Sequence, residues 1–267
     1  HMTSDSVLLQ IKNGVATVTL NQPEVRNALT PELRTSFREI IASLEFNNDA
    51  RCIVITGAGD HFMSGGDIRS MVDRLSLDEA ERRKQILEGI HLLHLPIFAI
   101  RRMGKPVIAS VRGAAAGFGV GLVAACDLAI ASSKAFFTLA YCHIGASPDG
   151  GSSYFLGRTL GMKQQMELAF LGDRFSSERA EELGIVNWVV PDEELDAETH
   201  KLAVRLASGP TVAYSNAKKL FNQTNHLSME SQLQMEAERM ADSMITSDHA
   251  EGITAFMEKR PPKFSGK

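Results

Sequence analysis

Two short apolar segments each lead into a glycine-rich turn, and this order constrains the fold more than any other feature. Residues 52–56 (CIVIT) precede a turn that contains Gly65 and Gly66, and residues 107–111 (VIASV) precede the segment 113–121. Continuous apolar runs of this length are typical of parallel strands buried on both faces. A glycine turn that opens a helix leaves backbone N–H groups free, where the helix dipole favours negative charge. Either turn alone is equally typical of tight strand–helix packing, whereas two that converge would form an oxyanion hole.

A β-hairpin and a helix are predicted before the first glycine turn. Residues 7–12 and 15–20 alternate in hydrophobicity around Asn13-Gly14, a dipeptide that two-residue hairpin turns favour. Thr30-Pro31-Glu32 then has the order of an N-cap, a first-turn proline and an acidic first turn. This order predicts a helix that runs to about residue 47.

Helices dominate the second half of the sequence. Ser76-Leu77-Asp78-Glu79 has the spacing of a capping box and predicts a helix to about residue 100, with a kink or an end at Pro96. Strands alternate with helices early and helices follow late, which predicts an α/β architecture with a helical C-terminal section. Further strands are expected at 128–131, 135–138 and 186–190, and further helices at 117–126, 152–160, 163–171, 177–183, 193–208, 210–223, 228–246 and 248–259.

Composition excludes several classes of function. The 267 residues are 44% hydrophobic, which is enough for one large domain with a sizeable core. The net charge of −4 argues against nucleic acid and against an anionic membrane surface, and no apolar run is long enough to span a bilayer. Three cysteines lie in apolar runs without CxxC spacing, which predicts reduced thiols and a cytoplasmic location. No signal peptide is visible, and His1-Met2 has the form of a tag remnant.

Several motifs occur in a characteristic order. The first glycine turn reads HFMSGGDI from His61 to Ile68, and the second segment runs from Gly113 to Ala125-Cys126-Asp127. The segment 21–29 (NQPEVRNAL) precedes them, and the segments 183–190 and 252–260 follow them. In this order the segments resemble the motifs of the crotonase superfamily, the enoyl-CoA hydratase/isomerase family. The resemblance covers essentially the whole chain.

The resemblance implies a crotonase fold, which is a spiral of ββα units, and acyl-CoA thioesters as substrates. Residues 3–195 would form the spiral core with the acyl-CoA site, and residues 196–267 would cover the CoA and build a homotrimer or a dimer of trimers. No metal and no separate cofactor are expected, because coenzyme A enters as part of the substrate. The N–H groups of Gly66 and Phe118 would be the oxyanion donors. The residues along the CoA path would be Arg26, Ala28, Ser64, Asp67 and Ile68.

Departures from the family pattern bear on the chemistry. Hydratases of the family carry two glutamates that activate water, and the matching positions here are Gly121 and Tyr141. The carboxylate that remains nearby is Asp149, in the segment 145–151 (GASPDGG). Some isomerases of the family, including the ring-epoxyphenylacetyl-CoA isomerase type, have aspartate there and have tails that resemble residues 256–267. One acid–base group suits a proton shuttle between two carbons of the acyl chain.

Alternatives remain for the residues around this carboxylate. Pro-Asp-Gly is a common turn sequence, so Asp149 could be a turn residue. His143 is a rival base or a structural histidine, and Tyr141 could donate a hydrogen bond to substrate or simply pack. Both are also candidate substrate-binding residues. We expect Asp149 in a mostly apolar pocket beside Tyr141, Cys142 and Ile144. His91 and His94 lack further metal ligands nearby and are interpreted as helix-face residues.

The sequence leaves several functions open. The first hypothesis is an acyl-CoA isomerase that shifts a double bond, or rearranges a ring substrate, through Asp149. The second is an enoyl-CoA hydratase that positions water by other means. A thioester hydrolase or a decarboxylase on the same scaffold is the third. A non-catalytic acyl-CoA binder is the fourth, although such a protein would need neither glycine turn nor Asp149.

Overall fold

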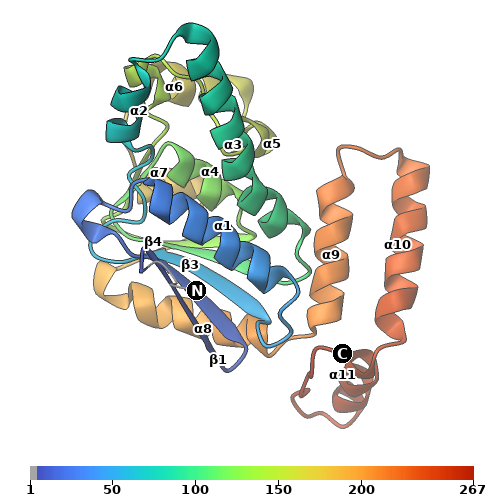
Figure 1. Cartoon of the computed structure of the whole chain (residues 1–267). Helices are drawn as coiled ribbons and strands as arrows, with labels where there is room; N and C mark the ends of the chain where they lie inside the picture. The colour runs from blue at the N-terminus through green and yellow to red at the C-terminus, as the bar shows by residue number, and fades with distance from the viewer. Residues whose placement is uncertain (1–4) are drawn as a thin grey trace.

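A six-stranded sheet lies at the centre of the computed structural model, which describes residues 5–267 (Figure 1). The tag remnant His1-Met2 and the first two residues of the 3–195 section lie outside these residues. The strand order is β1-β2-β3-β4-β6-β9, and only the β1–β2 pair is antiparallel. The strands are β1 (Val7–Lys12), β2 (Val15–Leu20), β3 (Cys52–Gly57), β4 (Val107–Val111), β6 (Leu128–Ser132) and β9 (Trp188–Val190).

The predicted hairpin is confirmed at β1 and β2. Asn13 and Gly14 connect the strands with φ values of 52° and 78°. Positive φ at both central residues is the requirement of a type I′ turn, whose twist matches that of the strands.

The inner strands β3, β4 and β6 are buried on both faces of the sheet, as their continuous apolar sequences predict. Along β3, Ile53 and Ile55 pack in the cluster under α1 (Pro31–Glu45), whereas Cys52 and Val54 pack in the cluster under α8 (Leu195–Ala207). Figure 1 shows α1 over the sheet and α8 beneath it. Full burial of each large apolar side chain contributes roughly 1.5–3 kcal/mol to stability.

A second, three-stranded sheet lies beside the glycine segments. Its order is β5-β7-β8, with β5 (Ala114–Ala116), β7 (Phe136–Thr138) and β8 (Phe175–Ser176). The strand β5 falls inside the second glycine segment, where only a turn and a helix were predicted. Alanine has little strand propensity, so the three alanines of β5 do not predict a strand by themselves. Pairing with β7 stabilises the extended backbone there.

The helix that ends near residue 100 corrects two expectations. α3 (Glu79–Arg102) begins after Asp78, whose side chain accepts a hydrogen bond from Glu81 N at 2.9 Å, and Ser76 is not its cap. Pro96 does not end the helix, because it is buried with Ile97 and packing holds the helix across it.

None of the described helices is long and apolar enough to cross a bilayer. The other helices are α2 (Ile68–Arg74), α4 (Phe118–Ala125), α5 (Ser152–Thr159), α6 (Met162–Leu171), α7 (Ser177–Glu182), α9 (Thr211–Gln223), α10 (Met229–Met244) and α11 (Ser247–Met257).

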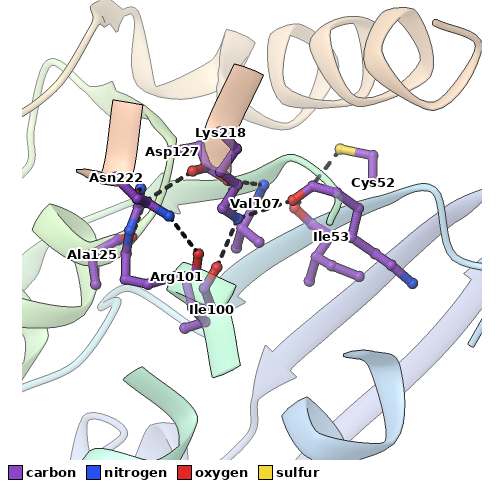
Figure 2. Close-up of polar contacts among 10 residues, drawn as sticks. Cys52, Ile53, Ile100, Arg101, Val107, Ala125, Asp127, Lys218 and Asn222 are labelled. Atoms are coloured by element: carbon purple, nitrogen blue, oxygen red, sulfur yellow. Dashed lines mark hydrogen bonds and ion pairs between the residues drawn. The ribbon is translucent and has the colours of Figure 1, made fainter. Parts of the chain in front are cut away.

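A buried lysine joins the C-terminal helices to the rest of the chain. Figure 1 shows α9, α10 and α11 beside the sheet rather than over it. From α9, the Lys218 ammonium donates to the carbonyl oxygens of Ile100 and Lys105 at 2.7 and 3.1 Å and contacts Asp127 Oδ2 at 2.8 Å (Figure 2). Burial lowers the pKa of Lys218, and the charge of Asp127 opposes that shift.

The same aspartate also binds an arginine at the end of α3. Arg101 Nη1 contacts Asp127 Oδ1 at 2.9 Å, and Asn222 of α9 donates to the Arg101 carbonyl at 2.9 Å (Figure 2). We call Arg101, Asp127, Lys218 and Asn222 the α9 joint. It ties α9 to α3 and to the start of β6 through charge-assisted hydrogen bonds.

Candidate active site

The first glycine turn is held between two other segments of the chain. On one side residues 63–66 run beside residues 26–29, and on the other they run beside β5. This arrangement brings the predicted N-terminal motif and both glycine motifs together. The hydrogen bonds are Ser64 N to Arg26 O (3.0 Å), Leu29 N to Gly65 O (2.8 Å), Met63 N to Ala114 O (3.0 Å) and Ala116 N to Met63 O (2.9 Å).

The two glycine turns touch at Gly65 and Gly117. A Cβ added to Gly65 would lie 3.1 Å from the Ala116 carbonyl oxygen, and one added to Gly117 would lie 3.8 Å from Gly65 Cα. Their φ values of 99° and 55° are in the region that favours glycine. Gly66 and Phe118 directly follow these glycines, so their N–H groups belong to adjoining turns. Phe118 is the first residue of α4, where an N–H group has no acceptor within the helix.

A tyrosine and an aspartate form the polar pair of the site. The Tyr141 hydroxyl donates to Asp149 Oδ1 at 2.6 Å, which answers the question of what Tyr141 contacts. Burial, and then the neighbouring Asp149 charge, raise the pKa of Tyr141, so its phenol stays protonated as a donor. Among residues 5–267, no group donates a hydrogen bond to the second oxygen of Asp149. That oxygen is therefore free to take up a proton.

A histidine of α3 fixes the loop that carries the aspartate. Gly150 N donates to His94 Nε2 at 2.9 Å, so this residue on the face of α3 also contacts a loop, which was not expected. Gly150 has a φ of 65°, and a Cβ there would lie 2.5 Å from the Phe118 ring. The Asp149 loop thus rests on the first residue of α4. No local pattern links His94 to a loop so distant in sequence, and this explains why it was missed.

The surroundings of Asp149 are more charged than expected. Ile144 is 53% exposed, and Cys142 lies against Gly172, so only Tyr141 of the three expected neighbours contacts the carboxylate. The reason is the short 3₁₀ helix at residues 141–144, which turns the side chains of Cys142 and Ile144 away from that of Tyr141. Arg34 of α1 lies within electrostatic range of Asp149 instead.

Gly121 has no space for a side chain. A Cβ at this position would lie 2.8 Å from Ser152 Oγ and 2.9 Å from the Gly150 carbonyl oxygen. A glutamate here, as in hydratases of the family that the motifs resemble, would have to displace the Asp149 loop. The absence of this carboxylate is therefore built into the packing of α4 on α5.

We predict that Gly121→Ala lowers both stability and any activity that depends on Asp149. Overpacking of this kind typically costs about 1–3 kcal/mol, and thermal unfolding would measure it. The control is Gly157→Ala in α5, where a Cβ meets nothing within 4 Å. Since alanine favours a helix over glycine by about 1 kcal/mol, the control should be at least as stable as the unchanged protein. Equal melting temperatures of the two variants would contradict the packing argument.

A cavity of about 460 Å³ lies beside the small sheet. Arg26, Ser64 and His143 line it, which brings these three predicted binding residues together. Arg174 also lines it, with its guanidinium 4.6 Å from the centre of the Phe136 ring. Arginines suit phosphate groups and an aromatic face suits a purine ring. Arg174 was missed because it lies in no motif.

The other predicted residues lie elsewhere. Ala28 is buried, Asp67 accepts a hydrogen bond from Ser70 Oγ at 2.7 Å, and Ile68 is 57% exposed; none of these lines the cavity. His143 Nε2 lies 2.9 Å from the Gly172 carbonyl oxygen. A carbonyl oxygen only accepts, so Nε2 is the donor in this contact and Nδ1 is the acceptor nitrogen of the ring, which leaves His143 as a rival base. Within residues 5–267 no group of three His, Cys, Asp or Glu side chains is placed to hold a metal.

Comparison with known proteins identifies a common family. The family model described as enoyl-CoA hydratase/isomerase matches residues 10–267. The chain is 33% identical over 262 residues, 98% of each chain, to 1,2-epoxyphenylacetyl-CoA isomerase of Escherichia coli K12. It is 32% identical over the full length of trans-2-decenoyl-[acyl-carrier-protein] isomerase of Streptococcus mutans. The solved structure of an enoyl-CoA hydratase from Polaromonas sp. JS666 is 36% identical, with a TM-score of 0.89 over 97% of this chain and 99% of that one. The predicted crotonase fold is confirmed.

Proposed function

Because this chain belongs to the enoyl-CoA hydratase/isomerase family, we propose that it is an enoyl-CoA isomerase whose acid–base group is Asp149. The observation that carries the proposal is the Tyr141–Asp149 hydrogen bond of 2.6 Å, which leaves one carboxylate oxygen free. Gly121 and Tyr141 stand where hydratases of the family carry glutamates, so the two-carboxylate activation of water has no counterpart. The names of the relatives include both isomerases and hydratases.

Asp149 would move one proton along the acyl chain. Its free oxygen takes a proton from C2 of a 3-enoyl thioester, and the electron pair of that C–H bond delocalises over the chain and onto the thioester oxygen. The same proton then returns to C4, which leaves a double bond between C2 and C3. No water and no oxidant is consumed, and the product is an isomer of the substrate. Tyr141 would donate its hydrogen bond to the other Asp149 oxygen throughout.

The two glycine turns would stabilise the intermediate charge. The N–H groups of Gly66 and Phe118 follow the contacting glycines Gly65 and Gly117. Preorganised donors aimed at a developing oxyanion are worth about 3 kcal/mol each in related settings. The Met71 methyl group covers Gly66 and would have to move when a thioester binds.

The cavity beside the small sheet would receive the nucleotide part of coenzyme A. Arg26 and Arg174 supply positive charge for its phosphates, and Ser64 supplies a hydroxyl. The guanidinium of Arg174 lies over the Phe136 ring, and this contact places the positive charge at the cavity. These features support an anionic, nucleotide-bearing ligand and fit acyl-CoA.

Product analysis tests the proposed reaction. The unchanged protein is incubated with 3-hexenoyl-CoA and, separately, with crotonyl-CoA, and the thioesters are identified by mass and chromatography. Conversion of 3-hexenoyl-CoA to an isomer of equal mass, without a gain of water from crotonyl-CoA, is the expected result. Gain of water with no isomerisation would instead make the protein a hydratase. Release of free CoA would indicate a thioester hydrolase.

We also propose that the C-terminal helices bind second and third copies of this chain in a trimer. Within the described residues, α10 has no buried side chain, and Ile245 and Phe256 are 85% and 80% exposed. Figure 1 shows these helices beside the core, with α9 paired to α10 and little else against them. Apolar patches of this kind mark interfaces.

Light scattering should give three times the monomer mass, or six times, and Phe256→Glu should shift the protein toward monomer. A monomer at micromolar concentration would contradict the proposal.

A further inference from the structure

Two arginines within electrostatic range of each other have no carboxylate partner among the residues that the structure describes. Arg34 of α1 donates through Nη2 to the Gly89 carbonyl of α3 at 2.7 Å. Arg74 of α2 has its Nε atom buried without a hydrogen-bond partner among the described residues. Within residues 5–267 neither guanidinium forms an ion pair. We call Arg34 and Arg74 the arginine pair.

Arg34 lies within electrostatic range of two other arginines, Arg74 and Arg38, and of one carboxylate, Asp149. Burial, and then the charge of Arg74, lower the pKa of Arg34, while Asp149 opposes this shift. Asp149 is the carboxylate within electrostatic range of Arg34, and one of its oxygens already accepts from Tyr141. Partly buried cations without a partner are costly, so the arrangement is suited to an anion that arrives from outside.

The placement of the arginine pair points to the acyl group. Arg74 is three residues beyond Met71 on α2, so the two side chains share a face of that helix. The Met71 methyl group covers Gly66, the proposed oxyanion residue. On α3, the contact of Arg34 at Gly89 lies five residues before His94, which holds the Asp149 loop. An acyl chain that starts at Gly66 and passes Asp149 would therefore extend toward the arginine pair.

We propose that Arg34 and Arg74 bind a carboxylate at the far end of the acyl group, so that the substrates are CoA thioesters of dicarboxylic acids. This inference rests on the proposed acyl-CoA function. A guanidinium matches a carboxylate through two parallel hydrogen bonds, which is the strongest pairing available to an uncoordinated carboxylate. A methyl terminus would leave both arginines unpaired.

Calorimetric binding of saturated thioesters tests the inference, because saturated chains cannot isomerise. Adipoyl-CoA is compared with hexanoyl-CoA, and suberoyl-CoA with octanoyl-CoA, so that each pair differs only at the chain end. At least one dicarboxylic thioester should bind the unchanged protein about 10–100-fold more tightly than its partner, the usual size of a charge-assisted contact. Arg74→Met and Arg34→Met should remove most of this preference and leave hexanoyl-CoA affinity unchanged. Arg83→Met, at an exposed site on α3, is the control and should retain the preference.

Each other outcome overturns the inference. Equal affinity of the unchanged protein for both members of each pair would show that the arginine pair binds no acyl carboxylate, while the proposed acyl-CoA function would stand. Failure of every thioester to bind would reject both. Loss of isomerase activity in the arginine variants, with the binding preference intact, would show that the pair acts only on Asp149.

Discussion

Replacing Asp149 with asparagine is expected to lower kcat for 3-enoyl-CoA isomerisation by about 10²–10⁴-fold, the usual contribution of a general acid–base group. Asparagine keeps the size of the side chain, and its amide oxygen can still accept from the Tyr141 hydroxyl, now 2.6 Å from Asp149 Oδ1. The amide nitrogen that replaces the free carboxylate oxygen cannot take up a proton. The loss should therefore fall on proton transfer alone.

Acyl-CoA affinity should remain close to that of the unchanged protein. The groups proposed to bind the thioester oxygen and the nucleotide come from other segments, the glycine turns and the cavity with Arg26 and Arg174. Calorimetry with hexanoyl-CoA separates binding from chemistry in the Asp149→Asn variant. Asp73→Asn, at an exposed site on α2, controls for the loss of one negative charge. Isomerisation by Asp149→Asn at the unchanged rate would leave Asp149 as a turn residue, and another base would be needed.

Local patterns predicted the central sheet well. Its inner strands are buried on both faces, and such strands are apolar at successive positions, which the sequence of a single strand shows. The run 52–56 is apolar at successive positions, and alternate residues pack under α1 and under α8. The strand β5 could not be predicted in this way. Its three alanines become a strand through pairing with β7 and through the hydrogen bonds with Met63, which are long-range contacts.

The residues of the candidate site also fall into two groups, those that a local motif predicts and those that only the fold brings to the site. The glycine turns, Tyr141 and Asp149 could be named from motifs, since each lies in a segment with a local signature. His94, Arg34 and Arg174 could not, because each comes from a different element and only the fold brings it to the site or to the cavity beside it. The apolar pocket expected for Asp149 was wrong for this reason. The residues adjacent in sequence are mostly turned away, and a residue of α1 supplies the nearby charge.

Replacing Lys218 with methionine is expected to lower the free energy of unfolding by about 3–5 kcal/mol, as the loss of one partner from a buried ion pair typically does. The Lys218 side chain is only 9% exposed, and its ammonium binds two carbonyl oxygens as well as Asp127. Methionine fills similar space but leaves these acceptors without their donor. Arg101 still contacts Asp127, so the lower end of the range is expected. Urea unfolding measures the difference.

The pH dependence of this difference follows from the direction of the pKa shift. Burial lowers the pKa of Lys218 below its ordinary value of 10.5, so the folded protein releases this proton before the unfolded chain does. Between the folded-state and the unfolded-state pKa of Lys218, the unfolded chain binds more protons than the native protein. In that range the free energy of unfolding therefore increases as the pH rises. Methionine does not titrate. The stability gap between the unchanged protein and Lys218→Met should therefore widen toward pH 10.5 and stay constant well below the folded pKa.

The neighbouring lysine gives the matched control, because Lys219 lies on the exposed side of the same helix. Lys219→Met removes the same charge without touching the α9 joint and should be within about 0.5 kcal/mol of the unchanged protein. In Lys218→Met, amide exchange should accelerate first in α9 and α10, since the joint is what ties α9 to α3 and to Asp127. Uniform acceleration across the central sheet, or equal stability of the two variants, would mean that the C-terminal helices do not depend on this lysine for their position.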